Sequence, residues 1–231
     1  MYLPYLEYQQ GPKVLHQMLA EDSVLFVDFI KLCFKPTPRS DDAETAEAAS
    51  ATDVADGPES APTPQNQRRA ENAYRVLRGW DAVPGRREDG TLDEAALRAW
   101  VGRARALLKD AKRVEIGDEQ IGRILAYAPP DAEGTSPPKV VRDLFEELQN
   151  DNLEGGFEAE MFNQGGITSR APDTGGDPER TVAKDLRARA EPFNEQWPRA
   201  AAILRRLADT YDSLATLNDQ RAERFRRGIF N

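Results

Sequence analysis

From Gln65 onward, apolar residues return every three or four positions, which is the spacing of helices that bury one face. This spacing predicts helices over about 65–82, 91–113, 116–127, 136–148, 177–193 and 195–215. No alternation of apolar and polar residues over four or more positions survives its flanking context as a half-buried strand. The pattern therefore predicts an all-α protein, built as an irregular multi-helix bundle or stack.

Cap residues place the starts of several of these helices. Ser23 fits the N-cap of a short N-terminal helix, and Thr91 with Glu94 fits a capping box. Ser136, followed by a proline, predicts a cap with proline in the first turn, and Asp177 with the next proline predicts another helix start.

Residues 1–35 predict a pair of short helices. The second, over about 24–34, is apolar on nearly every side and needs cover on several of them. Thirty-five residues are too few to supply that cover, so the pair packs on the rest of this chain or on something outside it. The aromatic start, with Tyr2, Tyr5 and Tyr8, favours the second alternative and indicates a piece of something longer.

Residues 36–64 differ in composition from the rest of the chain. They contain seven acidic residues, one basic residue and five prolines, and Val54 is their only large aliphatic residue. Such a segment buries too little apolar area to offset its backbone entropy, so we expect a disordered acidic linker. The predicted organisation is a helical pair at 1–35, this linker, a helical body at 65–217 and a basic C-terminal tail at 218–231.

The composition excludes several classes of protein. One cysteine and one histidine exclude an internal disulfide framework and any site with two imidazoles from one chain. No apolar run approaches the ~20 residues of a membrane-spanning helix, and the N-terminus lacks the pattern of a secretory signal. We therefore expect a cytoplasmic protein with no membrane association, no metal and no cofactor.

Single reactive residues are better explained as structural. His16 has no nucleophile or metal ligand at a suitable spacing, and Cys33 lies in an apolar helix where a thiol is inert. Acidic pairs such as Glu158 and Glu160 fit a charged helix surface. These interpretations favour a protein that is not an enzyme, although sequence spacing does not exclude reactive groups that converge only in space.

The most unusual segment is the glycine-rich stretch at 162–180. Two Gly-Gly pairs bracket a serine and an arginine ahead of a predicted helix, and glycine lets backbone amides approach an anion closely. The candidate contacts for a phosphate, a carboxylate or a partner are Asn163, Ser169, Arg170 and Arg180. The stretch is neither a Walker A loop nor a dinucleotide fingerprint, so a loop ordered by its own hydrogen bonds explains it equally well.

Five strings of the body carry a resemblance: GDEQIGRILA at 117–126, VRDLFE at 141–146, the segment at 162–170, WPR at 197–199 and LRR at 204–206. Together they resemble the C-terminal region of large bacterial proteins of unknown function, over about 65–215 and less closely over 1–35. The resemblance implies the end of a longer bacterial protein with a role in defence against phage. It implies no catalytic residues.

We therefore expect a non-catalytic helical interaction or scaffold module, whose partner is another protein or the remainder of its own longer chain. The alternative is a helical domain that senses a ligand or nucleic acid through residues 163–180. Nucleic-acid binding by the arginine-rich tail is disfavoured, because acids are interleaved with the arginines and the sequence pI is about 4.9.

Overall fold

The computed structural model describes residues 13–36, 63–165 and 173–227. Within these ranges every regular element is helical, and a lone β-bridge between Arg86 and Leu92 does not extend into a strand. The predicted all-α class is confirmed. The predicted linker lies outside the described residues apart from its ends, and Pro64 already begins a helix. None of the described helices pairs enough length with enough apolar character for a membrane crossing.

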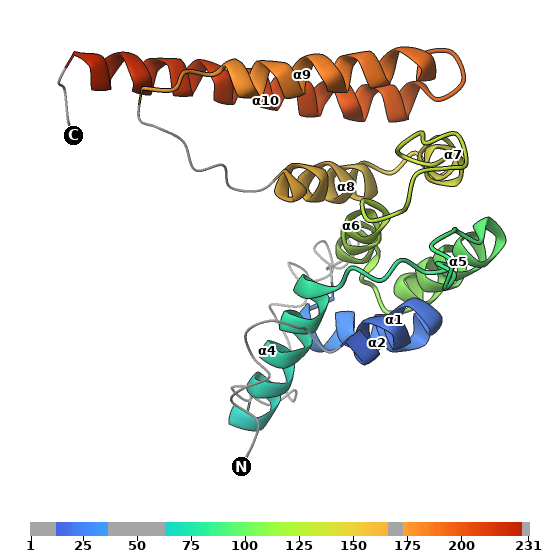
Figure 1. Ribbon diagram of the computed structural model, residues 1–231. Helices are drawn as coiled ribbons and strands as arrows, with labels where there is room; N and C mark the ends of the chain where they lie inside the picture. The colour runs from blue at the N-terminus through green and yellow to red at the C-terminus, as the bar shows by residue number, and fades with distance from the viewer. Residues whose placement is uncertain (1–12, 37–62, 166–172, 228–231) are drawn as a thin grey trace, which may run out of the picture.

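The helices form three successive layers in an elongated stack (Figure 1). In chain order they are α1 (Lys13–Glu21), α2 (Ser23–Cys33), α4 (Pro64–Gly79), α5 (Glu94–Asp110), α6 (Val114–Leu125), α7 (Lys139–Leu148), α8 (Asp151–Gln164), α9 (Asp177–Ala190), the short 3-10 helix η1 (Glu191–Phe193) and α10 (Pro198–Arg226). The first four make the N-terminal layer, α6 to α8 the middle layer, and α9 and α10 a hairpin across the far end. One continuous set of buried apolar side chains joins the layers.

Three aromatic rings hold the N-terminal layer together. Phe26 of α2 contacts the rings of Trp80 and Trp100, with ring centroids 5.4 and 5.1 Å apart. Each indole N–H donates to a carbonyl oxygen of α1, Trp80 to His16 and Trp100 to Leu19, both at 3.1 Å. The cover that α2 needs therefore comes from α1, α4 and α5 of the same chain.

The middle layer depends on a close crossing of α6 and α8. A Cβ atom added at Gly122 would lie 1.9 Å from the carbonyl oxygen of Leu153, and one added at Gly156 would lie 2.0 Å from that of Glu119. The two backbones therefore touch, with a glycine from each helix at the contact. α8 is absent from the predicted helices, although it is central to this layer.

α10 is the longest described helix, and its first turns dock on α7. Glu146 of α7 accepts the backbone N–H groups of Arg199 and Ala200 at 2.7 and 3.3 Å, and so caps α10 from another helix. Pro198 lies in the first turn, where it displaces no helical hydrogen bond. The boundary predicted at residue 217 is not a structural one, because α10 continues unbroken to Arg226.

Three predicted helix starts are wrong in detail. Asp22 rather than Ser23 caps α2, and Asp93 rather than Thr91 caps α5. In both cases a nearby aspartate supplies the side-chain oxygen that accepts a first-turn N–H group. α7 begins three residues after Ser136, which therefore does not cap it. The start predicted for α9 is confirmed.

Candidate functional site

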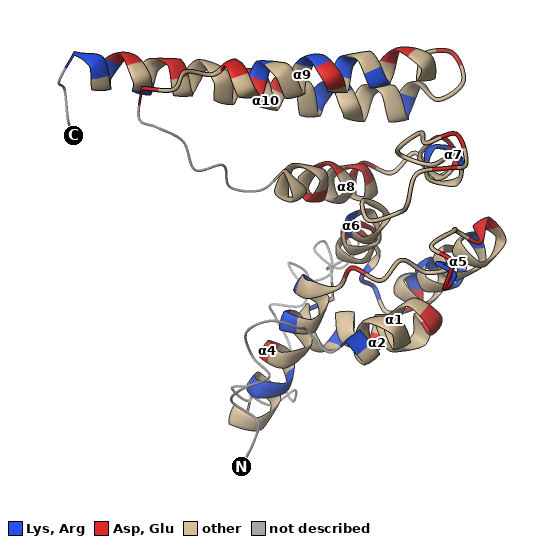
Figure 2. Cartoon of the chain, viewed as in Figure 1, with Lys and Arg blue, Asp and Glu red and all other residues tan. Residues whose placement is uncertain are grey.

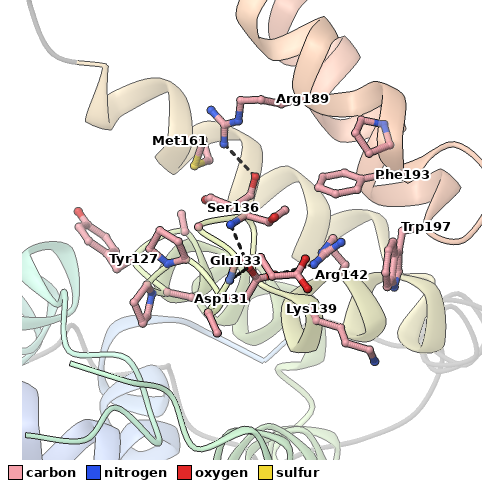
Figure 3. A pocket seen from close by; sticks show the side chains of 18 of the residues that line it. Tyr127, Asp131, Glu133, Ser136, Lys139, Arg142, Met161, Arg189, Phe193 and Trp197 are labelled. Carbon is pink, nitrogen blue, oxygen red and sulfur yellow. Dashed lines mark hydrogen bonds and ion pairs between the residues drawn. The ribbon is translucent and has the colours of Figure 1, made fainter. Parts of the chain in front are cut away.

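An open groove of about 1240 Å³ lies between the middle layer and the α9–α10 hairpin (Figure 3). One wall is the loop at 126–136 with the first turn of α7, and the other is the end of α8, the end of α9 and η1. Aromatic, proline and methionine side chains line it: Tyr127, Pro129, Pro130, Met161, Pro192, Phe193 and Trp197. Charged side chains line it as well: Glu94, Asp131, Glu133, Lys139, Arg142 and Arg189. We call this feature the groove.

The loop wall takes its shape from one carboxylate. Asp131 Oδ1 accepts the backbone N–H groups of Glu133 and Thr135 at 3.2 and 2.9 Å, and the backbone of the loop closes with Asp131 N–H donating to Thr135 at 3.0 Å. Gly134 has a φ of +78°, which glycine adopts without strain. The other oxygen, Asp131 Oδ2, points away from the loop and accepts a hydrogen bond from Arg142 at 2.8 Å.

Arg142 is the most unusual residue of the groove, because an arginine that is only 6% exposed is rare unless it is fully paired. Its central carbon lies 4.6 Å from the centroid of the Phe193 ring and 4.1 Å from that of Trp197. Those two rings stand at 87° to each other, so the guanidinium occupies the corner between them. Among the described residues, none accepts a hydrogen bond from the buried Nε of Arg142.

Asp143, the next residue along α7, fixes the orientation of the Trp197 ring through a hydrogen bond. Its Oδ1 accepts the indole N–H at 2.8 Å, and its Oδ2 accepts from Lys139 at 2.7 Å and from Arg98 at 3.0 Å. Burial alone would raise the pKa of Asp143, but the hydrogen bonds from Lys139 and Trp197 outweigh burial and the pKa is lowered. The carboxylate therefore stays ionised, and it orients the ring on which Arg142 rests.

Two further contacts hold the loop wall in place. Tyr127 Oη donates to Glu160 at 2.6 Å, and burial together with this carboxylate raises the pKa of Tyr127 to about 12. Arg189, from the last turn of α9, donates to the carbonyl oxygen of Ser136 at 3.0 Å and so ties the two walls together (Figure 3). The Arg189–Ser136 hydrogen bond therefore cross-links the two walls.

This lining offers a ligand ring faces, proline and methionine surface, and charged groups of both signs. Its three acidic and three basic side chains balance in formal charge. A concave, largely apolar surface with a few fixed polar groups is typical of a binding site. In the part of the chain that the structure describes, no group of three or more His, Cys, Asp or Glu residues is placed to hold a metal ion.

Of the four contacts predicted in the glycine-rich segment, the structure describes two. Asn163 is exposed in the last turn of α8, and Arg180 lies in the first turn of α9. Ser169 and Arg170 lie outside the described residues. The prediction that these residues bind a ligand stays a prediction, and neither Asn163 nor Arg180 lines the groove.

The start of α9 does hold an anion, and the anion is a carboxylate of this chain. Asp219 of α10 accepts the backbone N–H of Gly176 at 2.7 Å and a hydrogen bond from Arg180. The hydrogen bond from Arg180, followed by that from the Gly176 amide, holds the pKa of Asp219 below its ordinary value. The glycine there serves a close approach to α10, because an added Cβ atom would lie 2.2 Å from the carbonyl oxygen of Ala215.

The other reactive residues named from the sequence lie away from the groove or support its walls. His16 is buried, with Nδ1 3.2 Å from Asp81, and burial raises the pKa of the half-buried Cys33 thiol to about 11. Glu160 was predicted on a charged helix surface, and this is wrong: it is 6% exposed. It turns inward because Tyr127 and Arg123 both donate to it, Arg123 at 3.0 Å.

The residues that build the groove, above all Asp131 and Arg142, were not among the predicted contacts. One local signal exists, because Arg142 interrupts a run in which Val140, Val141 and Leu144 are all buried. A basic residue inside such a run indicates either a solvated edge or a paired cation. The spacing of apolar residues does not show that Arg142 meets Trp197, which lies 55 positions later in the sequence.

Comparison with known proteins finds no relative of this chain. The chain matches no protein-family model, no curated protein and no solved structure. The resemblance to the C-terminal region of large bacterial proteins therefore stays a prediction.

Proposed function

We propose that this chain is a non-catalytic helical interaction module, and that the groove binds a segment of a protein partner. The observation that carries the proposal is a groove whose rings are oriented by partly buried hydrogen bonds, with Trp197 held by Asp143 and Tyr127 held by Glu160. Aromatic side chains with fixed orientation are the usual anchors of protein interfaces. The resemblance adds to the proposal that the partner is the remainder of a longer bacterial protein, of which this chain is a part, or a separate protein.

The walls of the groove favour binding because they are already set. The Arg189–Ser136 hydrogen bond, the Asp131 loop contacts and the Arg142 corner each fix a different part of the lining. On binding, a ligand segment loses conformational entropy, whereas the side chains that line the groove lose little. This favours recognition of an extended segment without a rearrangement of the helices.

The charge pattern favours protein over nucleic acid. The groove has as many acids as bases, and acids and bases also alternate along α9 and α10 (Figure 2). Nucleic-acid affinity depends on many unopposed cations that neutralise phosphates. Here the arginines are repeatedly paired, as when Arg187 meets both Asp209 and Asp212.

Selection of peptides on the intact chain tests the proposal. A phage-displayed library of random 12-residue peptides would be panned on the protein, and the selected peptides synthesised and measured by fluorescence polarisation. Ala132 is exposed in the loop wall, so Ala132→Trp should obstruct the groove without touching the core. We expect it to weaken binding at least ~10-fold, the loss of one well-buried contact.

Ala106→Trp is the matched control, because Ala106 is also exposed but lies on α5, outside the groove lining. It should leave the affinity unchanged. Both variants would be checked by circular dichroism for an unchanged melt. If every selected peptide binds the Ala132→Trp protein as tightly as the unmodified chain, the groove is not the binding surface and the proposal fails.

A further inference from the structure

Arg142 is incompletely satisfied, and the structure contains a comparison that makes this plain. Arg105 uses Nε and Nη2 together to hold both oxygens of the buried Asp118, at 2.8 and 3.1 Å. Arg142 uses only Nη2, on a single oxygen of Asp131. Its Nε is buried, and within the described ranges it has no acceptor. A guanidinium edge that suits a two-oxygen ligand thus holds one oxygen.

Asp131 is unable to fill that edge, because its other oxygen is committed elsewhere. Oδ1 accepts the N–H groups of Glu133 and Thr135 and holds the loop in shape. Turning the carboxylate to face Arg142 with both oxygens would break those contacts. The loop residues next to it, from Ala132 to Gly134, are exposed, so the loop has room to move away from Arg142.

We propose that the segment bound in the groove carries a carboxylate, and that this carboxylate takes both Nε and Nη2 of Arg142 in place of Asp131. The proposal rests on the proposed function and names the chemistry of its partner: an aspartate or glutamate side chain of a polypeptide. Asp131 then acts as an internal ligand: its carboxylate pairs with the Arg142 guanidinium until the carboxylate of the partner replaces it.

The surroundings of Arg142 fit this role. Phe193 and Trp197 hold the guanidinium in their corner, so its donors keep their direction when the ligand changes. Lys139 and Arg189 line the same groove and add positive charge, and Glu133 and Glu94 oppose it. The local charge is therefore close to neutral, and one acidic residue among apolar neighbours fits better than a run of acids.

The test uses the peptides that bind the groove, synthesised as pairs that differ only by glutamate or glutamine at each acidic position. At one position the glutamate peptide should bind the unmodified chain about 10-fold more tightly, as a charge-assisted bidentate pair requires. Arg142→Lys keeps the charge but loses the planar edge, and should remove most of that preference.

Asp131→Asn is the decisive variant. An asparagine oxygen still accepts the loop N–H groups, but the side chain no longer offers Arg142 a carboxylate oxygen. With the competitor removed, the glutamate peptide should bind about 5- to 10-fold more tightly, and the glutamine peptide should be unchanged. Asp89→Asn is the matched control, because Asp89 also caps an exposed turn, through Thr91, and lies outside the groove lining.

The outcomes separate this inference from the proposed function. If Ala132→Trp abolishes binding but no glutamate–glutamine pair differs, the groove binds peptides and the carboxylate proposal is wrong. It is equally wrong if Asp131→Asn and Asp89→Asn behave alike with the glutamate peptide. A 50 mM acetate competitor that displaces glutamate and glutamine peptides equally would also overturn it. Should Arg142→Lys fail to fold, the asparagine variant still decides the question.

Discussion

Alanine in place of Gly156 tests the close crossing of α6 and α8 on which one wall of the groove is built. The new Cβ atom would lie 2.0 Å from the carbonyl oxygen of Glu119, and 2.8 and 3.0 Å from its carbonyl and α carbons. These are backbone atoms of a helix, so relief requires moving α6 as a whole. Overpacking a core lowers the free energy of unfolding by ~1–3 kcal/mol when side chains shift to relieve the contact. Here the contacting atoms belong to the backbone, so we expect Gly156→Ala to lower it by about 3 kcal/mol.

The neighbouring residue supplies the control. Gly155 lies on the same helix, is exposed, and has nothing within 4 Å of an added Cβ atom. Alanine there should stabilise the protein by about 1 kcal/mol, because glycine is a poor helix former. Adjacent substitutions of the same kind should therefore differ by about 4 kcal/mol and have opposite signs. For a chain of this size that difference separates the two melting temperatures by roughly 12 °C.

Thermal and urea unfolding followed by circular dichroism at 222 nm measures the difference. Gly122→Ala probes the crossing from the other helix, where the added atom would lie 1.9 Å from the carbonyl oxygen of Leu153, and should match Gly156→Ala. If Gly156→Ala melts within about 2 °C of Gly155→Ala, the helices do not touch at this point and the account of the middle layer is refuted.

Three further predictions follow from buried and half-buried polar groups. Because burial raises the pKa of Cys33 from 9.0 to about 11, iodoacetamide at pH 8 should label it about 100-fold more slowly than a free cysteine, and equal rates by mass spectrometry would contradict this. Tyr127 has a folded pKa of about 12 against 10.0, so its stabilising contribution is complete below pH 10 and is lost between pH 10 and 12. Tyr127→Phe should flatten that part of the pH–stability curve, and an unchanged slope would refute the assignment. Glu154→Gln weakens the hydrogen bonds that Arg199 and Arg206 donate to this side chain, and should lower the free energy of unfolding in urea by about 2 kcal/mol. An unchanged free energy of unfolding would show that these two ionic hydrogen bonds do not stabilise the fold.

Helices whose buried face is wholly apolar were predictable from the sequence, and α8 was not. In α5 the buried positions are Leu97, Trp100, Val101, Ala104 and Leu108, all apolar and all at helical spacing. The buried positions of α8 are Leu153, Glu154, Gly156, Phe157 and Glu160. Three of these five are a glycine, which makes a backbone contact, and two glutamates, which accept hydrogen bonds from other helices or loops. A pattern based on hydrophobicity is silent about all three.

The groove was beyond prediction for a different reason. Its loop wall lies before α7 in the sequence, and its aromatic wall follows α9, so the two meet only because α10 docks on α7. That docking depends on Glu146 capping α10 and on Asp143 holding Trp197. Each contact joins residues more than 50 positions apart, and each is polar. Periodicity shows which faces are apolar, but it carries no information about which polar pairs meet.

Among the described residues, three buried carboxylates are matched by partners on other segments, and Arg142 contrasts with them. Asp118 receives two hydrogen bonds from Arg105, Glu154 receives one each from two arginines, and Glu160 receives one from an arginine and one from a tyrosine. Such pairing is expected, because a buried charge without full hydrogen bonding is costly. Arg142 departs from it with one hydrogen bond and a buried, unpaired Nε, and it does so in the groove. These three acids are paired and Arg142 lacks an acceptor within the described ranges, and this contrast supports the proposal that a carboxylate of a partner supplies the missing oxygen.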